Sequence, residues 1–160
     1  MKLHELFDNP YKVQWDDSDP RDINATFKTA QGNTILVTFA QEIQRYDLWD
    51  ISFQIEFKSD KGFPQRTFNI SNTGDAPRVF ATVIAVMTDF MMDKKPDYVY
   101  FSSKMSEPSR IKLYDAMVRK AVKTVGGYHQ VDDLTEIPEE VANYVNNQDQ
   151  YGLKGWLFTS

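Results

Sequence analysis

The sequence predicts an α/β (α+β) fold in which an antiparallel β-meander continues into a strand–helix–strand–helix unit. Two observations predict it. Up to about residue 70, apolar side chains recur at every second position, which is typical of half-buried strands. From residue 76 onward the spacing changes to three and four, which is typical of helices that cover a sheet. We expect the 160 residues to form one domain, 1–160, with helices packed on a mixed sheet.

The first strand follows a short N-terminal segment. Residues 1–8 have apolar side chains at helical spacing, which predicts a short helix. Asn9-Pro10 ends this helix because a residue before proline avoids the helical region of backbone conformation. Residues 11–15 alternate large apolar with polar side chains, which predicts a strand. Residues 16–22 are acidic and contain Pro20, which predicts a turn.

A hairpin and a long strand are predicted next. Residues 23–27 and 35–39 alternate in the same way, and Gly32 between them supplies a turn. The clearest alternation in the chain runs through 49–57, where five large apolar side chains occupy every second position. We expect these five to line one buried face of a central strand. They are Trp49, Ile51, Phe53, Ile55 and Phe57.

Strands and helices then alternate. A strand at 67–70 precedes a helix that begins near Pro77, and Pro96 stops this helix. A buried strand follows at 98–101. Because a helix lies between them, we expect strands 67–70 and 98–101 to pair in parallel through a right-handed crossover.

The last quarter of the chain holds smaller elements. A second helix opens at Pro108 and ends at Gly126-Gly127, since glycine readily adopts the left-handed conformation that ends helices. A short strand at 128–131, a third helix at 137–146 and a final strand at 153–158 complete the expected order.

Composition excludes several classes of protein. The formal net charge is −5, with 18 basic and 23 acidic residues, which argues against a broad nucleic-acid surface. The chain has no cysteine and only two histidines, so we expect neither a disulfide framework nor a metal site, and His129 beside Asp132 and Asp133 matches no ligand motif. The first residues lack the apolar run of a signal peptide and no apolar stretch would span a bilayer, which predicts a cytoplasmic protein.

The junction before the first long helix is one candidate binding site. Thr73 and Gly74 lead from a strand into a helix, whose unpaired N–H groups and positive dipole end favour an anion. The alternative is an ordinary N-cap, in which Thr73 or Asp75 satisfies the first turn. Glycine is expected at position 74 because the turn calls for a conformation that other residues adopt with strain.

Three cations extend this candidate site. Arg78 lies in the first turns of one helix, Arg110 in those of the next, and Lys104 in the loop that precedes the second. If both helices pack on one sheet, these residues converge at the carboxyl ends of the strands, where open α/β sheets bind ligands. The alternative is three solvated or ion-paired surface side chains.

Three segments together carry a resemblance to known proteins. Met1 to Tyr11, Thr73 to Val83 and Glu107 to Tyr114 resemble a group of small, uncharacterised bacteriophage-encoded proteins. The resemblance covers about residues 1–130. It implies a phage protein made in the cytoplasm of the infected bacterium, and it implies no particular activity.

The second half also resembles the GNAT acyltransferase fold. That fold runs from antiparallel strands through a cofactor-binding helix and a strand to a helix with a Leu-Tyr pair, and Leu113-Tyr114 and Gly127-Tyr128 stand at the corresponding places. The resemblance implies acetyl-CoA as cofactor, held at the helix start by Thr73 and Gly74, and Tyr114 as general acid. The glycine-rich loop of the family is reduced here to the single Gly74, and Tyr114 also lies on an apolar stripe that favours a core position.

Three hypotheses about function follow. The first is a phage accessory protein of GNAT-like fold that binds a host or phage protein, or a small anionic ligand. The second is a diverged acyl-CoA-dependent N-acetyltransferase. The third is a structural component of the virion, and the sequence itself does not decide among the three.

Overall fold

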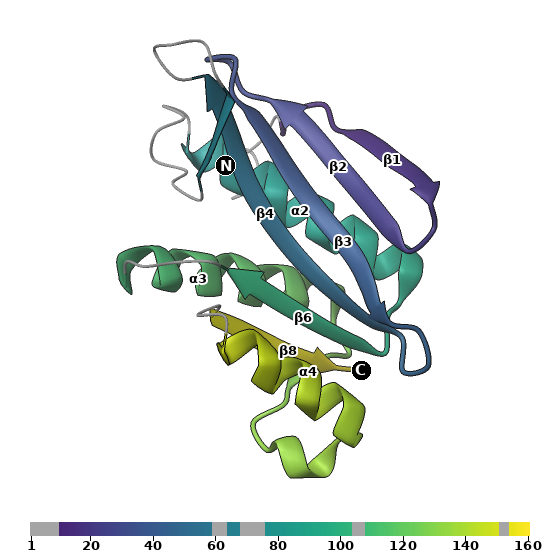
Figure 1. Ribbon diagram of the computed structural model, residues 1–160. Coiled ribbons are helices and arrows are strands. Elements are labelled where there is room, and N and C mark those ends of the chain that lie inside the picture. The colour runs from purple at the N-terminus through teal and green to yellow at the C-terminus, as the bar shows by residue number, and fades with distance from the viewer. Residues whose placement is uncertain (1–9, 59–63, 68–75, 104–107, 151–153) are drawn as a thin grey trace.

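The computed structural model describes residues 10–58, 64–67, 76–103, 108–150 and 154–160. The strands in these segments form one mixed sheet in the order β1-β2-β3-β4-β6-β8-β7, and β5 pairs with β4 (Figure 1). The strands are β1 (Gln14–Asp19), β2 (Asp22–Lys28), β3 (Thr34–Ile43), β4 (Leu48–Lys58), β5 (Pro64–Thr67), β6 (Tyr98–Ser103), β7 (His129–Gln130) and β8 (Lys154–Thr159). The α+β class is therefore confirmed.

The meander β2–β3–β4 is antiparallel throughout and follows the predicted alternation. Trp49, Ile51 and Phe53 of β4 are 4% exposed or less, so the predicted buried face is confirmed for these three. The side chains of Ile55 and Phe57 lie outside the part that the structure describes. The period-two pattern was sufficient here because one face of the strand packs on a continuous apolar core.

The predicted acidic turn at 16–22 is confirmed only at Pro20-Arg21 and is wrong for the residues before it. Residues Asp16 to Asp19 continue β1, and the chain turns only at Pro20-Arg21. β1 is the edge strand of the sheet, and all six of its residues are exposed. Carboxylates are tolerated on such a strand because they remain in water, and they also discourage pairing with other chains.

The predicted parallel pairing of strands 67–70 and 98–101 is also wrong in its partner. β6 pairs in parallel with β4, from Leu48↔Tyr98 to Ile51↔Phe101, and β5 pairs antiparallel with the far end of β4. β5 is the second arm of a hairpin with β4, so the crossover through the helix returns the chain to β4 itself. Residues 68–70 lie outside the described segments.

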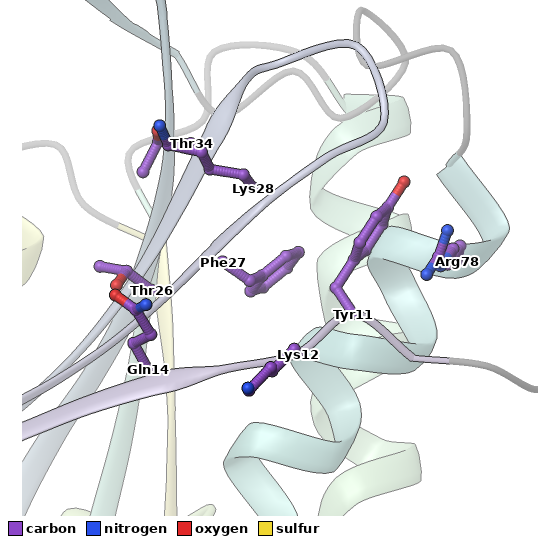
Figure 2. A pocket seen from close by; sticks show the side chains of 8 residues that line it. All are labelled: Tyr11, Lys12, Gln14, Thr26, Phe27, Lys28, Thr34 and Arg78. Carbon is purple, nitrogen blue, oxygen red and sulfur yellow. The ribbon is translucent and has the colours of Figure 1, made fainter.

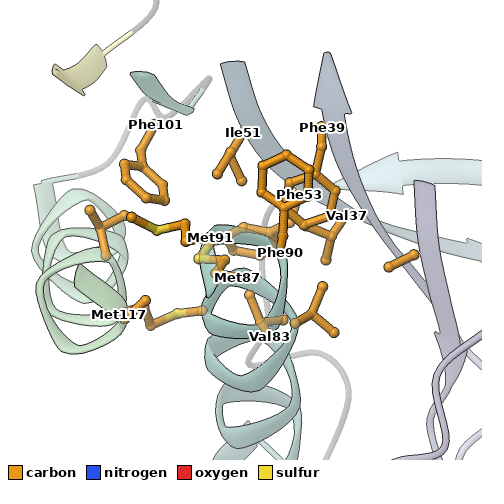
Figure 3. Close-up of a cluster of buried hydrophobic side chains, with 14 of the residues drawn as sticks. Val37, Phe39, Ile51, Phe53, Val83, Met87, Phe90, Met91, Phe101 and Met117 are labelled. Atoms are coloured by element: carbon orange, nitrogen blue, oxygen red, sulfur yellow. The ribbon is translucent and has the colours of Figure 1, made fainter. Parts of the chain in front are cut away.

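Two helices cover one face of the sheet and lie behind it in Figure 1. They are α2 (Ala76–Lys94) and α3 (Pro108–Val125), near the predicted bounds. Figure 3 shows the core that they share with β3, β4 and β6. Phe39 of β3 stacks on Phe90 of α2 with ring centroids 4.1 Å apart. The buried residues of α2 include Val79, Val83, Val86, Met87, Phe90 and Met91, so a broad side of the helix faces the sheet.

The other face of the sheet carries a smaller apolar cluster. The short helix η2 (Leu134–Glu136) and α4 (Glu139–Gln150) pack there over β6 and β8, and α4 lies in front of the sheet in Figure 1. Gly126 and Gly127 follow α3 with φ of +76° and +81°, as predicted for its end. No helix within the described segments is long and apolar enough to cross a membrane. The expected helix at 1–8 lies outside these segments.

Candidate functional site

A pocket of about 460 Å³ opens where the chain enters β1, beside the β2–β3 hairpin and the first turn of α2. Sites for small molecules usually span roughly 300–1,000 Å³, so the pocket has room for such a ligand. We call it the cationic pocket, and Figure 2 shows its lining. The residues that line it are Tyr11, Lys12, Gln14, Thr26, Phe27, Lys28, Thr34 and Arg78.

Tyr11 connects the pocket to the elements on either side. Its backbone N–H donates to Thr82 Oγ1 of α2 at 2.9 Å, and its hydroxyl accepts from the Ala30 N–H at 2.9 Å. Its ring stacks on Phe27, with centroids 5.7 Å apart and planes 17° apart. Because backbone, ring and hydroxyl are all held, these two rings form a preorganised floor for the pocket.

Arg78 closes the helix side of the pocket. The carbon of its guanidinium lies 3.7 Å from the centroid of the Tyr11 ring, a cation–π contact. Figure 2 shows Phe27, Tyr11 and Arg78 in series. The stack fixes one positive charge at a defined point of the wall, and the prediction that Arg78 lies in the first turns of a helix is confirmed.

The electrostatics of the pocket oppose those of the whole chain. Lys12, Lys28 and Arg78 give its lining three cationic side chains, and no carboxylate is among the lining residues that the structure describes. Lys12 and Lys28 are exposed, so their ammonium groups can turn toward a ligand. On a chain of net charge −5, the charges of these described lining residues favour an anion at this place over a cation.

The side chains of the other predicted binding residues lie outside the part of the chain that the structure describes. Thr73, Gly74 and Lys104 lie outside the described segments, and Arg110 begins α3 without a described side chain. The expected convergence of Arg78, Lys104 and Arg110 therefore stays a prediction.

Tyr114 lies in the core between α3 and the sheet. It is 1% exposed, and its hydroxyl donates to the Ile51 carbonyl at 3.3 Å. Its ring stacks on Phe53 at 5.1 Å and contacts Trp156 at 5.5 Å. Burial raises the pKa of this hydroxyl well above its ordinary value, so the group keeps its proton.

A second polar group lies on the opposite face of the sheet. The Ser102 hydroxyl donates to Asp50 Oδ1 at 2.6 Å, and the Tyr144 hydroxyl of α4 donates to Asp50 Oδ2 in a short bond. Burial raises the pKa of Asp50 to about 6, the two hydroxyl donors oppose that rise, and nearby Glu42 adds to it. With both carboxyl oxygens engaged, this Asp50 cluster ties α4 and β6 to β4.

The cationic pocket was missed from the sequence except for Arg78. Lys12 and Lys28 read as ordinary strand-end lysines, and only the pairing of β1 with β2 brings them to one place. One signal was available. An aromatic residue precedes a lysine at both sites, as Tyr11-Lys12 and Phe27-Lys28.

The acidic residues that follow His129 have a structural role. His129, Asp132 and Asp133 are exposed, and Asp133 Oδ1 caps η2 by accepting from the Thr135 N–H at 2.9 Å. The hydrogen bonds from Thr135 lower the pKa of Asp133. Within the described segments, no three histidine, cysteine or acidic side chains gather in a way that could hold a metal ion.

Fold and site define a class: a mixed-sheet α+β domain with a positively charged pocket beside its first long helix. Residues 11–153 match the profile of DUF6934, a family of unknown function, and the chain belongs to this family. Comparisons with curated proteins and with solved structures gave no match.

Proposed function

We propose that the protein is a binding module that holds a small anionic ligand in the cationic pocket. The observation that carries this proposal is the lining: three cationic side chains surround an aromatic floor, without a carboxylate among the described lining residues. Two further features support it. Tyr11 and Phe27, which are 9% and 3% exposed, form the apolar part of the lining, and Thr26, Thr34 and Gln14 supply neutral hydrogen-bonding groups.

The expected ligand is an organic phosphate or carboxylate with a compact apolar body. Each charge-assisted hydrogen bond to a lysine is worth roughly 1.5–3 kcal/mol, so loss of one lysine should weaken binding about tenfold or more. An uncharged ligand of the same shape gains only the contact with the aromatic floor. Charge, rather than apolar contact, therefore decides affinity in this proposal.

Calorimetric titration with three probes tests it. We expect phenyl phosphate or benzoate to bind the wild type, and benzamide, their neutral counterpart, to give no measurable heat. Lys28→Gln should weaken anion binding about tenfold, whereas Lys120→Gln, an exposed lysine of α3 outside the lining, should leave it unchanged. Equal affinities for benzamide and the anions, or equal effects of the two variants, would overturn the proposal.

The second candidate is a diverged acyl-CoA-dependent N-acetyltransferase of GNAT-like fold. The observation that favours it is the parallel pair β4–β6, whose pairing ends at Ile51↔Phe101. The Tyr114 hydroxyl is bonded to the carbonyl of that same Ile51. In the GNAT resemblance this tyrosine protonates the departing thiolate of CoA, after the acyl carbon has bonded to the amine nitrogen.

Acetyl-CoA separates the two candidates. An acetyltransferase should release CoA thiol in the presence of a primary amine, and Tyr114→Phe should lower that rate by roughly a hundredfold or more without a large change in melting temperature. The binding module is supported instead if acetyl-CoA binds without turnover and if this binding is lost in Lys28→Gln. No binding and no thiol release would exclude the acetyltransferase.

We further propose the cytoplasm of an infected bacterium as the setting, which rests on the resemblance of the sequence to phage-encoded proteins. A host or phage protein as partner, and a structural role in the virion, are the alternatives to a small ligand. Tagged protein recovered from infected cells tests both. Stable association with particles supports the virion role, and association with one soluble protein supports the partner role.

A further inference from the structure

The pairing of β1 with β2 stops beside the cationic pocket. The two strands pair antiparallel from Asp16↔Asn24 to Gln14↔Thr26. Two residues further in the same register, Lys12 would stand directly opposite Lys28. The pairing ends before that point, and both lysines line the pocket instead.

The charges of the two lysines would oppose a continuation of the pairing. Like charges directly opposite each other destabilise a pair of strands. The preceding residue, Tyr11, also bonds through its backbone N–H to Thr82 of α2 rather than to β2. Figure 2 accordingly shows Lys12 and Lys28 on opposite sides of Phe27.

We infer that the ligand of this pocket carries a dianionic group of the phosphate-monoester type, which Lys12 and Lys28 bind at the same time. This inference rests on the proposed function and names the chemical class of its ligand. A dianion bound by both lysines can neutralise both positive charges, whereas a monoanion neutralises only one charge in total.

The neighbouring side chains suit the same group. Thr26 and Thr34 carry hydroxyls and Gln14 carries an amide, so the strand side of the pocket offers neutral donors next to the two ammonium groups. A phosphate monoester has three strong acceptor oxygens and a charge near −2 at pH 7. The cavity of about 460 Å³ leaves room for a small organic body attached to it.

The protonation state of the ligand also predicts that its affinity for the pocket depends on pH. The second proton of a phosphate monoester dissociates near pH 6, so the dianion is lost below that pH. Among the described residues, the charged and titratable groups that face the pocket are Lys12, Lys28, Arg78 and Tyr11, and none of them is a carboxylate or a histidine. Affinity for phenyl phosphate should therefore fall severalfold from pH 7.5 to pH 5.5. Affinity for phenyl sulfate, a monoanion throughout, should stay constant and controls for changes elsewhere in the protein.

A double-mutant cycle tests the inference by calorimetry at pH 7.5. We expect the wild type to bind phenyl phosphate at least tenfold more tightly than phenyl sulfate. Lys12→Gln and Lys28→Gln should each remove most of this preference, and the double variant should lose much less than the product of the two single losses. Lys120→Gln, on α3, should retain the full preference.

The outcomes separate the inference from the proposed function. If both anions bind with equal affinity and both affinities depend on Lys28, the proposed anion pocket is supported and the inference that its ligand is a dianion is overturned. If Lys12→Gln has no effect while Lys28→Gln does, simultaneous binding by both lysines is overturned as well. If neither anion binds, the proposed function and the inference fail together.

Discussion

Replacing Asp50 with asparagine is expected to remove a pH-dependent loss of stability of about 2 kcal/mol between pH 4 and pH 7. Burial raises the pKa of this carboxyl from 3.8 to about 6 in the folded protein. The folded state therefore holds the proton more tightly than the unfolded state. Its contribution to stability is complete below pH 3.8 and is lost as the pH rises through about 6.

Urea unfolding of the wild type and Asp50→Asn at several pH values checks this. Asparagine has the shape of the aspartate side chain and can still form hydrogen bonds with Ser102 and Tyr144. The free energy of unfolding of the variant should therefore rise relative to that of the wild type as the pH rises. Asp89→Asn, an exposed carboxylate of α2, is the matched control for removing one charge. A wild-type curve parallel to that of Asp50→Asn across the range would show that the carboxyl is not buried as described.

Replacing Gly155 with alanine is expected to destabilise the protein by about 1–3 kcal/mol. A Cβ at this position would lie 1.9 Å from the Tyr100 hydroxyl oxygen and 2.0 Å from the ring carbon that carries it. Tyr100 is 1% exposed, and its ring contacts Tyr144 of α4 edge-on at 5.8 Å. The ring therefore has little room to move aside, and the alanine must displace part of the smaller apolar cluster on this face of the sheet.

Differential scanning calorimetry measures this effect as a fall in melting temperature of roughly 3–10 °C. The double variant Gly155→Ala, Tyr100→Leu provides the control, because the shorter side chain removes the clash. Relative to Tyr100→Leu alone, the added alanine should then cost much less. An equal cost in both backgrounds would mean that Tyr100 does not cover Gly155.

Much of the fold followed from periodicity alone. Trp49, Ile51 and Phe53 were assigned to one buried face because their spacing matches a strand with a single apolar side. The ends of α2 and α3 were likewise marked by Pro77, Pro96 and the two glycines after α3. These signals are local, so they can be read without knowledge of the tertiary structure.

Pairing partners are not local in this way. β4 has eleven residues, which is long enough to hold β5 at one end and β6 at the other along one edge. Nothing in the spacing of residues 64–70 distinguishes that arrangement from a parallel pair with β6. The acidic residues of β1 were predicted to form a turn for another reason. An exposed edge strand can be as polar as a turn, so composition does not distinguish the two.

The candidate site was the least predictable part. The sequence singled out Arg78 for its place in a helix. Its position in the pocket, however, depends on the cation–π contact with Tyr11, which lies 67 positions earlier in the chain. Asp50 likewise occupies the polar side of an alternating strand, where a solvated carboxylate is the ordinary interpretation. α4, ninety-four positions later, brings Tyr144 over it and makes it a buried group.

Amide chemical shifts recorded during a titration with phenyl phosphate test the central claim most directly, because they locate the ligand. The anion pocket predicts saturable changes that centre on Lys12, Gln14, Thr26, Lys28 and Arg78, and that disappear in the double variant Lys12→Gln, Lys28→Gln. Changes centred instead on Asp50 and Ser102, or no saturable change at millimolar ligand, would contradict the account.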